Sequence, residues 1–228
     1  NNTANSLELF AACADAGVAN VIFSSTAAVY GAVEAECIHE GTPTVPVSPY
    51  GRSKLAAEYM LDDIARARGL RYGILRYFNV AGADPAGRAG QRTEGATHLI
   101  KVACECAAGV RPVLEVFGED YPTRDGTCER DFIHVSDLAE AHVLVYEYLR
   151  DGGASAVLNC GYGRGYTVRE VLEAVQALAG PIEIRSAGRR PGDPPRDVAD
   201  PGAIRRTLPW PPRHTDIRDS VGTALAWQ

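Results

Sequence analysis

Short apolar runs alternate along the chain with longer segments whose apolar residues recur every three or four positions, which predicts alternating strands and helices. A first helix is expected from residue 1 to Gly17, and the apolar run at 21–23 is expected to be a buried strand. A second helix should begin at Ser48 and Pro49, which suit the cap and first-turn positions, and end before Gly69. Strand, helix and strand in this order predict a parallel α/β sheet with right-handed crossovers.

The remainder of the chain continues this alternation. Thr167 and Glu170 form a capping box that predicts a helix start, and Ser136 is expected to cap the helix beside it. The glycine-rich segment 161–165 fits neither dinucleotide nor P-loop spacing, so a tight turn is the preferred interpretation. Further strands are expected at 71–83, 113–118, the second half of 119–135, 156–161 and 181–187, and further helices at 98–109, 136–151, 168–180, from 200 and from 215.

Composition limits the possible partners. The 228 residues can form one large domain, or one domain with a smaller lobe, and their net charge of −6 argues against a nucleic-acid or polybasic membrane surface. No apolar run reaches the length of a bilayer span and no signal sequence opens the chain, so we expect a soluble, cytoplasmic protein. The six cysteines lack zinc-binding spacing, which predicts reduced thiols and no metal site.

Tyr50 and Lys54 place a phenol and an ammonium group on one face of the second expected helix. A fixed cation nearby favours a phenolate, which can accept a proton from an alcohol. Such pairs also occur by chance on amphipathic helices, where the ring packs and the amine stays solvated. The preceding strand favours the catalytic interpretation, because it ends in the hydroxyls of Ser24, Ser25 and Thr26, and α/β proteins place their sites at that end of a strand.

Five motifs occur in order along the chain: FSSTAAVYG, SPYGRSK, RYFNVAGA, DGTCERDFIHVSDLAEAH and RRPGDPP. With these motifs the chain resembles the UDP-glucose 4-epimerases of the extended short-chain dehydrogenase/reductase family, from residue 1 to residue 228. The Tyr-x-x-x-Lys pair marks only the superfamily, whereas RYFNVAGA and the CERDF segment are more specific to the epimerase branch. The resemblance implies an α/β fold, with a Rossmann-like doubly wound parallel sheet and a smaller C-terminal substrate-binding lobe.

The resemblance also implies an activity and a cofactor. NAD would take hydride from sugar carbon 4 and return it to the other face, which interconverts UDP-glucose and UDP-galactose in galactose metabolism. Tyr50 would accept the proton of the sugar 4-hydroxyl, while Lys54 would hold the nicotinamide ribose. Thr26 would hydrogen-bond at the reacting hydroxyl, with Ser25 as the alternative for that role. The family further suggests a homodimer through helices near the tyrosine.

Other contacts are carried over from the family by motif. Arg130 and Arg190 would bind the UDP diphosphate, because planar guanidinium groups suit phosphate oxygens and would offset the acidic net charge. Asp193 would face the uridine ribose. NAD contacts are implied at Asn1, Thr26, Tyr50, Lys54 and Phe78, and further UDP-sugar contacts at Asn79, His98, Leu99, Val116 and Phe117.

Simpler explanations exist for several of these residues. Arg130 lies between two carboxylates and could be a solvated ion-pair member, and Phe78 could be only a core residue. Asp193 could simply shape the turn before a proline. Arg189 and Arg190 would form an unneutralised pair, which favours a ligand. His134 is interpreted as structural, and Asp197 stands where the family varies in side-chain size near the sugar, which leaves N-acetylated sugars possible.

The resemblance also predicts how the chain divides into domains. Residues 1–80 would be the C-terminal part of an NAD-binding domain, and 81–228 mainly a UDP-sugar-binding lobe, with segments at about 110–160 returning to the first sheet. The chain begins inside a helix and contains no glycine-rich dinucleotide turn, so we expect a chain cut into from upstream. By itself it should bind NAD poorly and be inactive.

Three alternatives stay open at the level of sequence. A related sugar-nucleotide dehydratase or decarboxylase would need an extra acid/base pair, and the alanines after Thr26 supply none. A non-catalytic UDP-sugar-binding fragment would explain the absent dinucleotide turn. An isolated piece with an exposed strand edge could also aggregate or stay unfolded.

Overall fold

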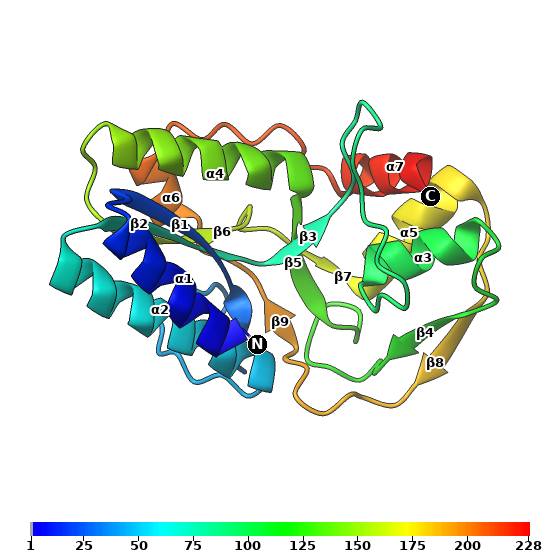
Figure 1. Ribbon diagram of the computed structural model, residues 1–228. Helices are drawn as coiled ribbons and strands as arrows, with labels where there is room; N and C mark the ends of the chain where they lie inside the picture. The colour runs from blue at the N-terminus through cyan, green and yellow to red at the C-terminus, as the bar shows by residue number, and fades with distance from the viewer. Residues whose placement is uncertain (1) are drawn as a thin grey trace.

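The computed structural model describes residues 2–228 and has an α/β architecture with parallel sheets (Figure 1). One sheet has the order β1-β2-β6, and all of its strands are parallel. Helices α1 and α2 cover one face of this sheet and α4 covers the other. The elements are α1 (Asn2–Asp15), β1 (Asn20–Thr26), α2 (Pro49–Arg68), β2 (Arg71–Tyr77), α4 (Val135–Arg150) and β6 (Ala156–Cys160).

The second group of elements is organised around β5. This strand pairs in parallel with β3 and β9 and antiparallel with β7, while β4 and β8 form a separate parallel pair. Helices α3, α5 and α7 pack together beside these strands (Figure 1). The elements are β3 (Asn79–Ala81), α3 (Leu99–Ala107), β4 (Leu114–Phe117), β5 (Glu129–His134), β7 (Gly165–Thr167), α5 (Val168–Ala179), β8 (Ile184–Ala187), β9 (Arg196–Asp197) and α7 (Ile217–Trp227).

Two short elements complete the chain, a 3₁₀ turn η1 (Ala27–Val29) directly after β1 and helix α6 (Gly202–Thr207). Of the segments expected to return to the first sheet, β6 lies beside β2, whereas β4 pairs with β8. None of the helices in residues 2–228 combines the length and the apolarity that a membrane crossing requires.

The predicted caps of two helices are confirmed. The Ser48 hydroxyl accepts the Gly51 N–H at 3.0 Å at the start of α2, and Gly69 ends that helix with φ of 76°. At α5, the Thr167 hydroxyl accepts the Glu170 N–H at 3.1 Å while the Glu170 carboxylate accepts the Thr167 N–H at 2.9 Å. These helix ends could be predicted from the sequence because the hydrogen bonds of a cap form between residues within one turn.

The prediction that Ser136 caps α4 is wrong. The helix begins one residue earlier, at Val135, and its cap is His134, whose Nδ1 accepts the Ser136 N–H at 3.1 Å. An imidazole nitrogen thus takes the place of the hydroxyl oxygen that the sequence pattern favours at this position.

The strand expected over 71–83 is divided between two sheets. β2 ends at Tyr77 and pairs with β1 and β6, whereas β3 begins at Asn79 and pairs with β5. Phe78 alone separates them, and its N–H donates to the Cys160 carbonyl at 3.2 Å. The first sheet thus leads directly into the second at this residue.

Candidate functional site

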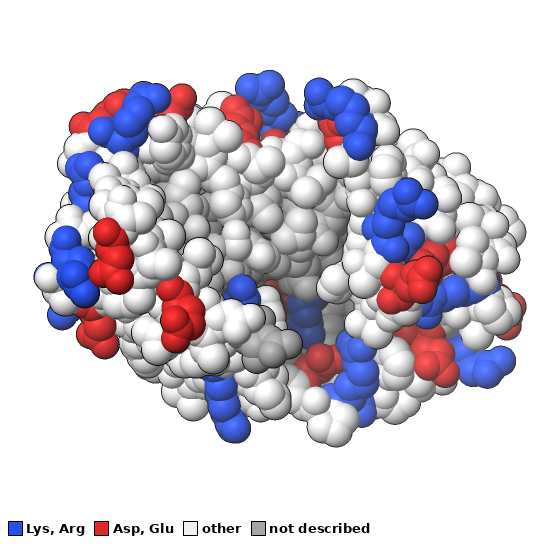
Figure 2. Space-filling model, in the orientation of Figure 1, with Lys and Arg blue, Asp and Glu red and all other residues white. Residues whose placement is uncertain are grey.

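A cavity of about 900 Å³ opens between the two groups of elements. Figure 2 shows this face of the molecule hollowed at its centre, with mostly uncharged walls and some Lys or Arg atoms toward the lower side. Its lining includes the following residues singled out from the sequence: Thr26, Tyr50, Phe78, Asn79, His98, Leu99, Val116, Phe117, Arg130, Arg190 and Asp193. The fold therefore brings together side chains that lie up to 167 positions apart in the chain.

Tyr50 lies in the first turn of α2 with 47% of its surface exposed, and it borders the cavity together with Thr26. Thr26 ends β1, and its hydroxyl accepts the Ala28 N–H at 3.2 Å. This bond orients the Thr26 side chain at the strand end while the hydroxyl proton stays available for another acceptor. A phenol and an aliphatic hydroxyl therefore face the same space.

Lys54 follows Tyr50 by one helical turn, and its Nζ lies 6.0 Å from the centre of the Tyr50 ring. The ammonium donates to the Ser24 carbonyl at 3.0 Å and lies 4.9 Å from the centre of the Phe23 ring. Burial lowers the pKa of Lys54. The two side chains thus lie one turn apart on α2, with the lysine anchored on the strand that carries Thr26.

Ser25 does not join the cavity. The Ser25 side chain is fully buried, and its hydroxyl donates to Glu58 Oε1 at 2.5 Å instead of facing the cavity. Side chains alternate between the two faces of a strand, which separates Ser25 from Thr26. Asn1 lies outside the described residues.

The cavity lining includes the consecutive residues 77–83, which begin with Tyr77, Phe78 and Asn79. Phe78 is only 6% exposed and also belongs to a core cluster, so the core and cavity interpretations both apply to it. Burial raises the pKa of Tyr77, and the charge of Tyr50 adds to this effect. Tyr77 was not predicted as a site residue, although its place within the RYFN motif, next to Phe78, could have indicated it.

The residues present fit the nicotinamide end of a dinucleotide. Among the described residues, the Lys54 ammonium makes one hydrogen bond, to Ser24, while an ammonium group has three N–H donors for partners such as ribose hydroxyls. The cavity wall supplies the aromatic ring of Phe78 and the hydroxyl of Thr26, whereas Lys54 is not among the residues that line it. A cationic donor, an aromatic surface and a hydroxyl are suitable partners for a ribose bearing a flat heterocycle.

Arg130 lines the cavity, and the acidic residues on either side of it in sequence do not neutralise its charge. In the described part of the chain its guanidinium forms no ion pair, and its hydrogen bond runs from Nη1 to the Glu129 carbonyl at 2.9 Å. The Glu129 carboxylate binds Arg124 and Arg196 instead. The buried Asp131 carboxylate accepts three backbone N–H groups, from Tyr162, Gly163 and Ala199. The solvated ion-pair interpretation of Arg130 is therefore not supported.

Arg190 has a different environment from the one expected. Its Nε donates to Asp193 Oδ2 at 2.9 Å, and its guanidinium lies 4.5 Å from the centre of the Phe117 ring. Arg189 pairs with Asp120 at 2.6 Å, so the argument from an unneutralised arginine pair is wrong. Stacking on Phe117 nonetheless holds the Arg190 guanidinium at the cavity wall.

His98 lines the cavity, whereas Asp197 lies behind its wall on β9. His98 is exposed at the N-terminus of α3, and its Nδ1 lies 2.7 Å from Gln91 Nε2. Asp197 is paired in register with Arg130 across β9 and β5 but does not line the cavity. Burial raises the pKa of Asp197, and the charge of Arg130 partly opposes this effect.

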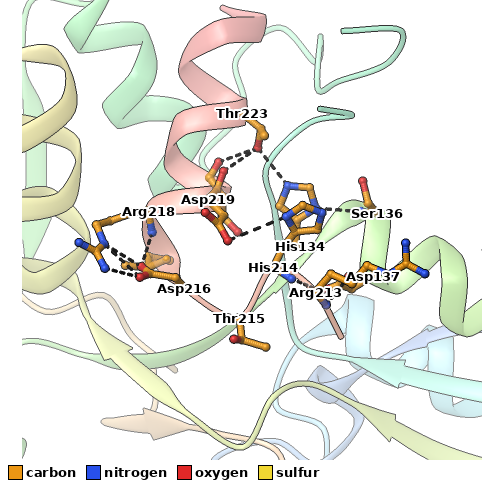
Figure 3. Close-up of polar contacts among 12 residues, drawn as sticks. His134, Ser136, Asp137, Arg213, His214, Thr215, Asp216, Arg218, Asp219 and Thr223 are labelled. Carbon is orange, nitrogen blue, oxygen red and sulfur yellow. Dashed lines mark hydrogen bonds and ion pairs between the residues drawn. The ribbon is translucent and has the colours of Figure 1, made fainter. Parts of the chain in front are cut away.

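His134 belongs to a cluster of polar side chains that includes Ser136, His214 and Thr223 (Figure 3). It is fully buried, and its ring stacks on His214 with 4.2 Å between the ring centres. Because Nδ1 accepts the Ser136 N–H, the ring proton lies on Nε2, which donates to Thr223 Oγ1 at 3.0 Å. Burial, followed by the charge of His214, lowers the pKa of His134 to about 4. These contacts join β5, α4 and α7.

Residues 1–161 match the model of the NAD dependent epimerase/dehydratase family. The chain belongs to this family. The match ends just after β6, so it includes the elements that carry Tyr50, Lys54 and Arg130 but not Arg190.

Relatives of known name cover the whole chain. The UDP-glucose 4-epimerase of Azospirillum brasilense is 58% identical over 229 residues, which are 100% of this chain and 66% of that protein. The crystal structure of the Brucella ovis UDP-glucose 4-epimerase in complex with NAD is 45% identical, with a TM-score of 0.96, and covers 99% of this chain and 70% of its own. The crystal structure of the Bifidobacterium longum UDP-glucose 4-epimerase in complex with NAD⁺ and UDP is 38% identical, with a TM-score of 0.94. The match covers 100% of this chain and 69% of that chain.

The chain thus spans about two thirds of the length of the curated family members it matches.

Several residues that line the cavity of the present chain were not singled out from the sequence. Most of them are apolar, such as Ile100, Leu114 and Phe132, and the polar or charged ones include Gln91, Lys101, Arg111 and Glu115. No local motif marks them, because they reach the cavity through the tertiary packing of α3, β4, β5 and the loops beside them.

Proposed function

We propose that the chain carries the proton-transfer and UDP-sugar-binding residues of an NAD-dependent UDP-glucose 4-epimerase, which interconverts UDP-glucose and UDP-galactose. The single observation that carries the proposal is the convergence of Tyr50 and Thr26 with Arg130 on one cavity. The identity of 58% with a UDP-glucose 4-epimerase supports it. We further infer that the sheet β1-β2-β6 is part of a doubly wound Rossmann-like sheet, and that the elements around β5 form the substrate lobe.

The chemistry of the chain's own residues begins with proton transfer. Tyr50 accepts the proton of the sugar 4-hydroxyl, and Lys54, held on the Ser24 carbonyl, stabilises negative charge on the phenol oxygen. Thr26 hydrogen-bonds at the same sugar oxygen and orients it toward Tyr50. When bound, NAD supplies a nicotinamide that accepts a hydride from carbon 4 and returns it. Lys54, Thr26 and Phe78 would hold the nicotinamide end of the cofactor.

The opposite wall of the cavity supplies the groups that recognise an anion. Arg130 presents an unpaired guanidinium, and Arg190 is positioned by Asp193 and Phe117. Guanidinium forks bind phosphate oxygens in a bidentate manner, so these arginines are assigned to the UDP diphosphate. A sugar tethered in this way can turn either face of carbon 4 to the cofactor side of the cavity while its 4-oxygen stays within reach of Tyr50, and the volume of about 900 Å³ leaves room for this rotation.

The decisive assay combines the full-length protein with UDP-galactose and NAD. We expect UDP-glucose as the product, with unchanged mass, and a loss of kcat of about 100-fold or more in Tyr50→Phe, the scale of a lost general base. Tyr146→Phe is the matched control, because this tyrosine of α4 is 49% exposed and lies away from the cavity. A product of lower mass would identify a dehydratase or decarboxylase, and full activity in Tyr50→Phe would overturn the mechanism.

The non-catalytic alternative is separated by calorimetric titration of the 228-residue chain with UDP-glucose and with NAD. We expect UDP-glucose to bind through Arg130 and Arg190, and NAD to bind weakly, because the sequence contains no glycine-rich dinucleotide turn. Binding of UDP-glucose with an inactive full-length protein would establish a binding module in place of an enzyme.

We also propose that the protein forms a homodimer through α1 and α2. Both helices expose large apolar side chains, since Leu9 is 60% exposed and Tyr59 is 58% exposed. Sedimentation velocity of the full-length protein tests this, with Leu9→Glu and Tyr59→Glu expected to shift the dimer toward monomer. A monomer at all concentrations would contradict it.

A further inference from the structure

A buried charged pair lies beneath the helix that carries Tyr50 and Lys54. Glu58 follows Lys54 by one turn of α2 and is 3% exposed, while its partner Arg76 on β2 is 7% exposed. Neither residue lines the cavity. The pair therefore belongs to the support of the site, and none of the steps proposed above uses it.

The contacts between the two side chains are bidentate. Arg76 Nη2 donates to Glu58 Oε2 at 2.6 Å, and Arg76 Nε lies 3.1 Å from Oε1 and 3.2 Å from Oε2. The remaining donor group, Nη1, donates to the Tyr30 hydroxyl at 3.0 Å, which in turn donates to Asn159 Oδ1 at 2.7 Å. This arrangement satisfies both charges and fixes the position of the Glu58 carboxylate.

The carboxylate held in this way accepts the Ser25 hydroxyl at 2.5 Å. Ser25 lies on β1 directly between Ser24, whose carbonyl binds the Lys54 ammonium, and Thr26. Helix α2 is therefore tied to the end of β1 at two points one turn apart, through Lys54 to Ser24 and through Glu58 to Ser25. Two ties of this kind oppose both sliding and rotation of the helix on the strand.

Stability alone does not explain the pair. Removing two charges from water costs about as much as their mutual attraction returns, and apolar replacements of buried pairs are often neutral. What the pair does provide is a fixed geometry, because the carboxylate can occupy only the position that satisfies Arg76 and Ser25 together.

We propose that Glu58, Arg76 and Ser25 form a positioning device that sets the register of α2 on β1, so that Tyr50 and Lys54 meet Thr26. The inference rests on the proposed function. Glu58 and Ser25 are positioning residues, since they act on the reacting groups only through α2 and β1. Their loss displaces Tyr50 and Lys54 without removing any group that touches the substrate.

The experiment compares Glu58→Gln, Ser25→Ala and the double variant in the full-length protein. We expect kcat to fall by about 10- to 100-fold in Glu58→Gln, because displacements on the order of 1 Å have effects of this size. Ser25→Ala, which leaves the ion pair intact, should lose less. The double variant should be no worse than Glu58→Gln, because both changes break the same tie. KM for the UDP-sugar should stay unchanged, since Arg130 and Arg190 are untouched.

The pH dependence of kcat separates positioning from a merely structural role. A displaced Lys54 ammonium stabilises negative charge at the reacting groups less well, so the acid limb of the profile should move to higher pH. Asp62→Asn is the matched control, because Asp62 is a carboxylate one turn further along α2 that binds Arg66 and Tyr72 rather than β1. It should change neither kcat nor the profile.

The outcomes distinguish the inference from the proposed function. An inactive wild-type protein would overturn the epimerase proposal itself. An active wild-type protein whose Glu58→Gln and Ser25→Ala variants retain full kcat and an unmoved pH profile would overturn the positioning device alone. If Glu58→Gln fails to fold, Ser25→Ala decides, since it removes only one hydroxyl and leaves no charge unpaired.

Discussion

Replacing His134 by Asn should make the stability of the protein less sensitive to acid. Asn is the natural choice because its side-chain oxygen can accept the Ser136 N–H and so preserve the cap of α4. The change removes the stacked imidazole and its hydrogen bond to Thr223. We expect the variant to be less stable at pH 7 by about 1–3 kcal/mol, the cost of a lost buried hydrogen bond with its packing.

The size of the pH effect follows from the pKa of His134, which burial and His214 lower to about 4. A folded-state pKa below the ordinary value of about 6.5 means that the unfolded chain binds more protons, so stability falls as pH drops from about 6.5 toward 4. Between pH 7 and pH 5 the wild-type protein should lose about 2 kcal/mol through this residue, at about 1.4 kcal/mol per pH unit. The carboxylates of Asp137 and Asp219, which also face the imidazole, oppose this effect.

Urea unfolding at pH 7 and pH 5, followed by tryptophan fluorescence, measures the difference in stability between the two proteins. We expect this difference to shrink by about 2 kcal/mol at the lower pH. Burial raises the pKa of Asp131 to about 6, which contributes with the opposite sign over nearly the same range, but Asp131 is present in both proteins and cancels. A difference that is the same at both pH values would refute the assignment of a neutral, buried His134.

Three further changes test the packing, the capping and the proposed anion site. Thr167→Ala removes the capping box of α5 and should cost about 1–2 kcal/mol in urea unfolding, and an unchanged midpoint would contradict this. Gly73→Ala would place a methyl group 2.2 Å from Val145 Cγ1, so thermal unfolding should show a loss of about 1–3 kcal/mol unless α4 can move away freely. Arg130→Met should weaken binding of UDP about tenfold or more in calorimetry, whereas the exposed Arg66→Met should not, and equal losses would indicate a general charge effect.

Local signals account for most of the elements that could be predicted from the sequence. Ser48 with Pro49, Thr167 with Glu170, and Gly69 each act through hydrogen bonds or dihedral angles within one turn, so their positions follow directly from the residues. The cap of α4 escaped this reasoning, because an imidazole rarely replaces a hydroxyl and its choice here depends on burial against α7.

Tertiary pairing decided what the sequence could not. The expected strand 71–83 is divided at Phe78 because each half pairs with a different partner strand. Strand β9 forms because Arg196 and Asp197 pair with β5. At the site, Thr26 and Tyr50 were located from motifs, but the burial of the Ser25 hydroxyl against Glu58 required the packing of α2 on β1. The arginine environments likewise depend on partners that are distant in sequence, as Arg189 and Asp120 illustrate.

Because Phe78 alone separates β2 from β3, this segment limits how the protein can vary over evolution. Tyr77, Phe78 and Asn79 face the cavity from a segment anchored in a different sheet at each end. An insertion or deletion of one amino acid there would invert the alternation of side chains in one of the two strands, turning interior groups outward. The segment should therefore tolerate substitutions far better than changes in length, which a library of single-codon deletions would reveal.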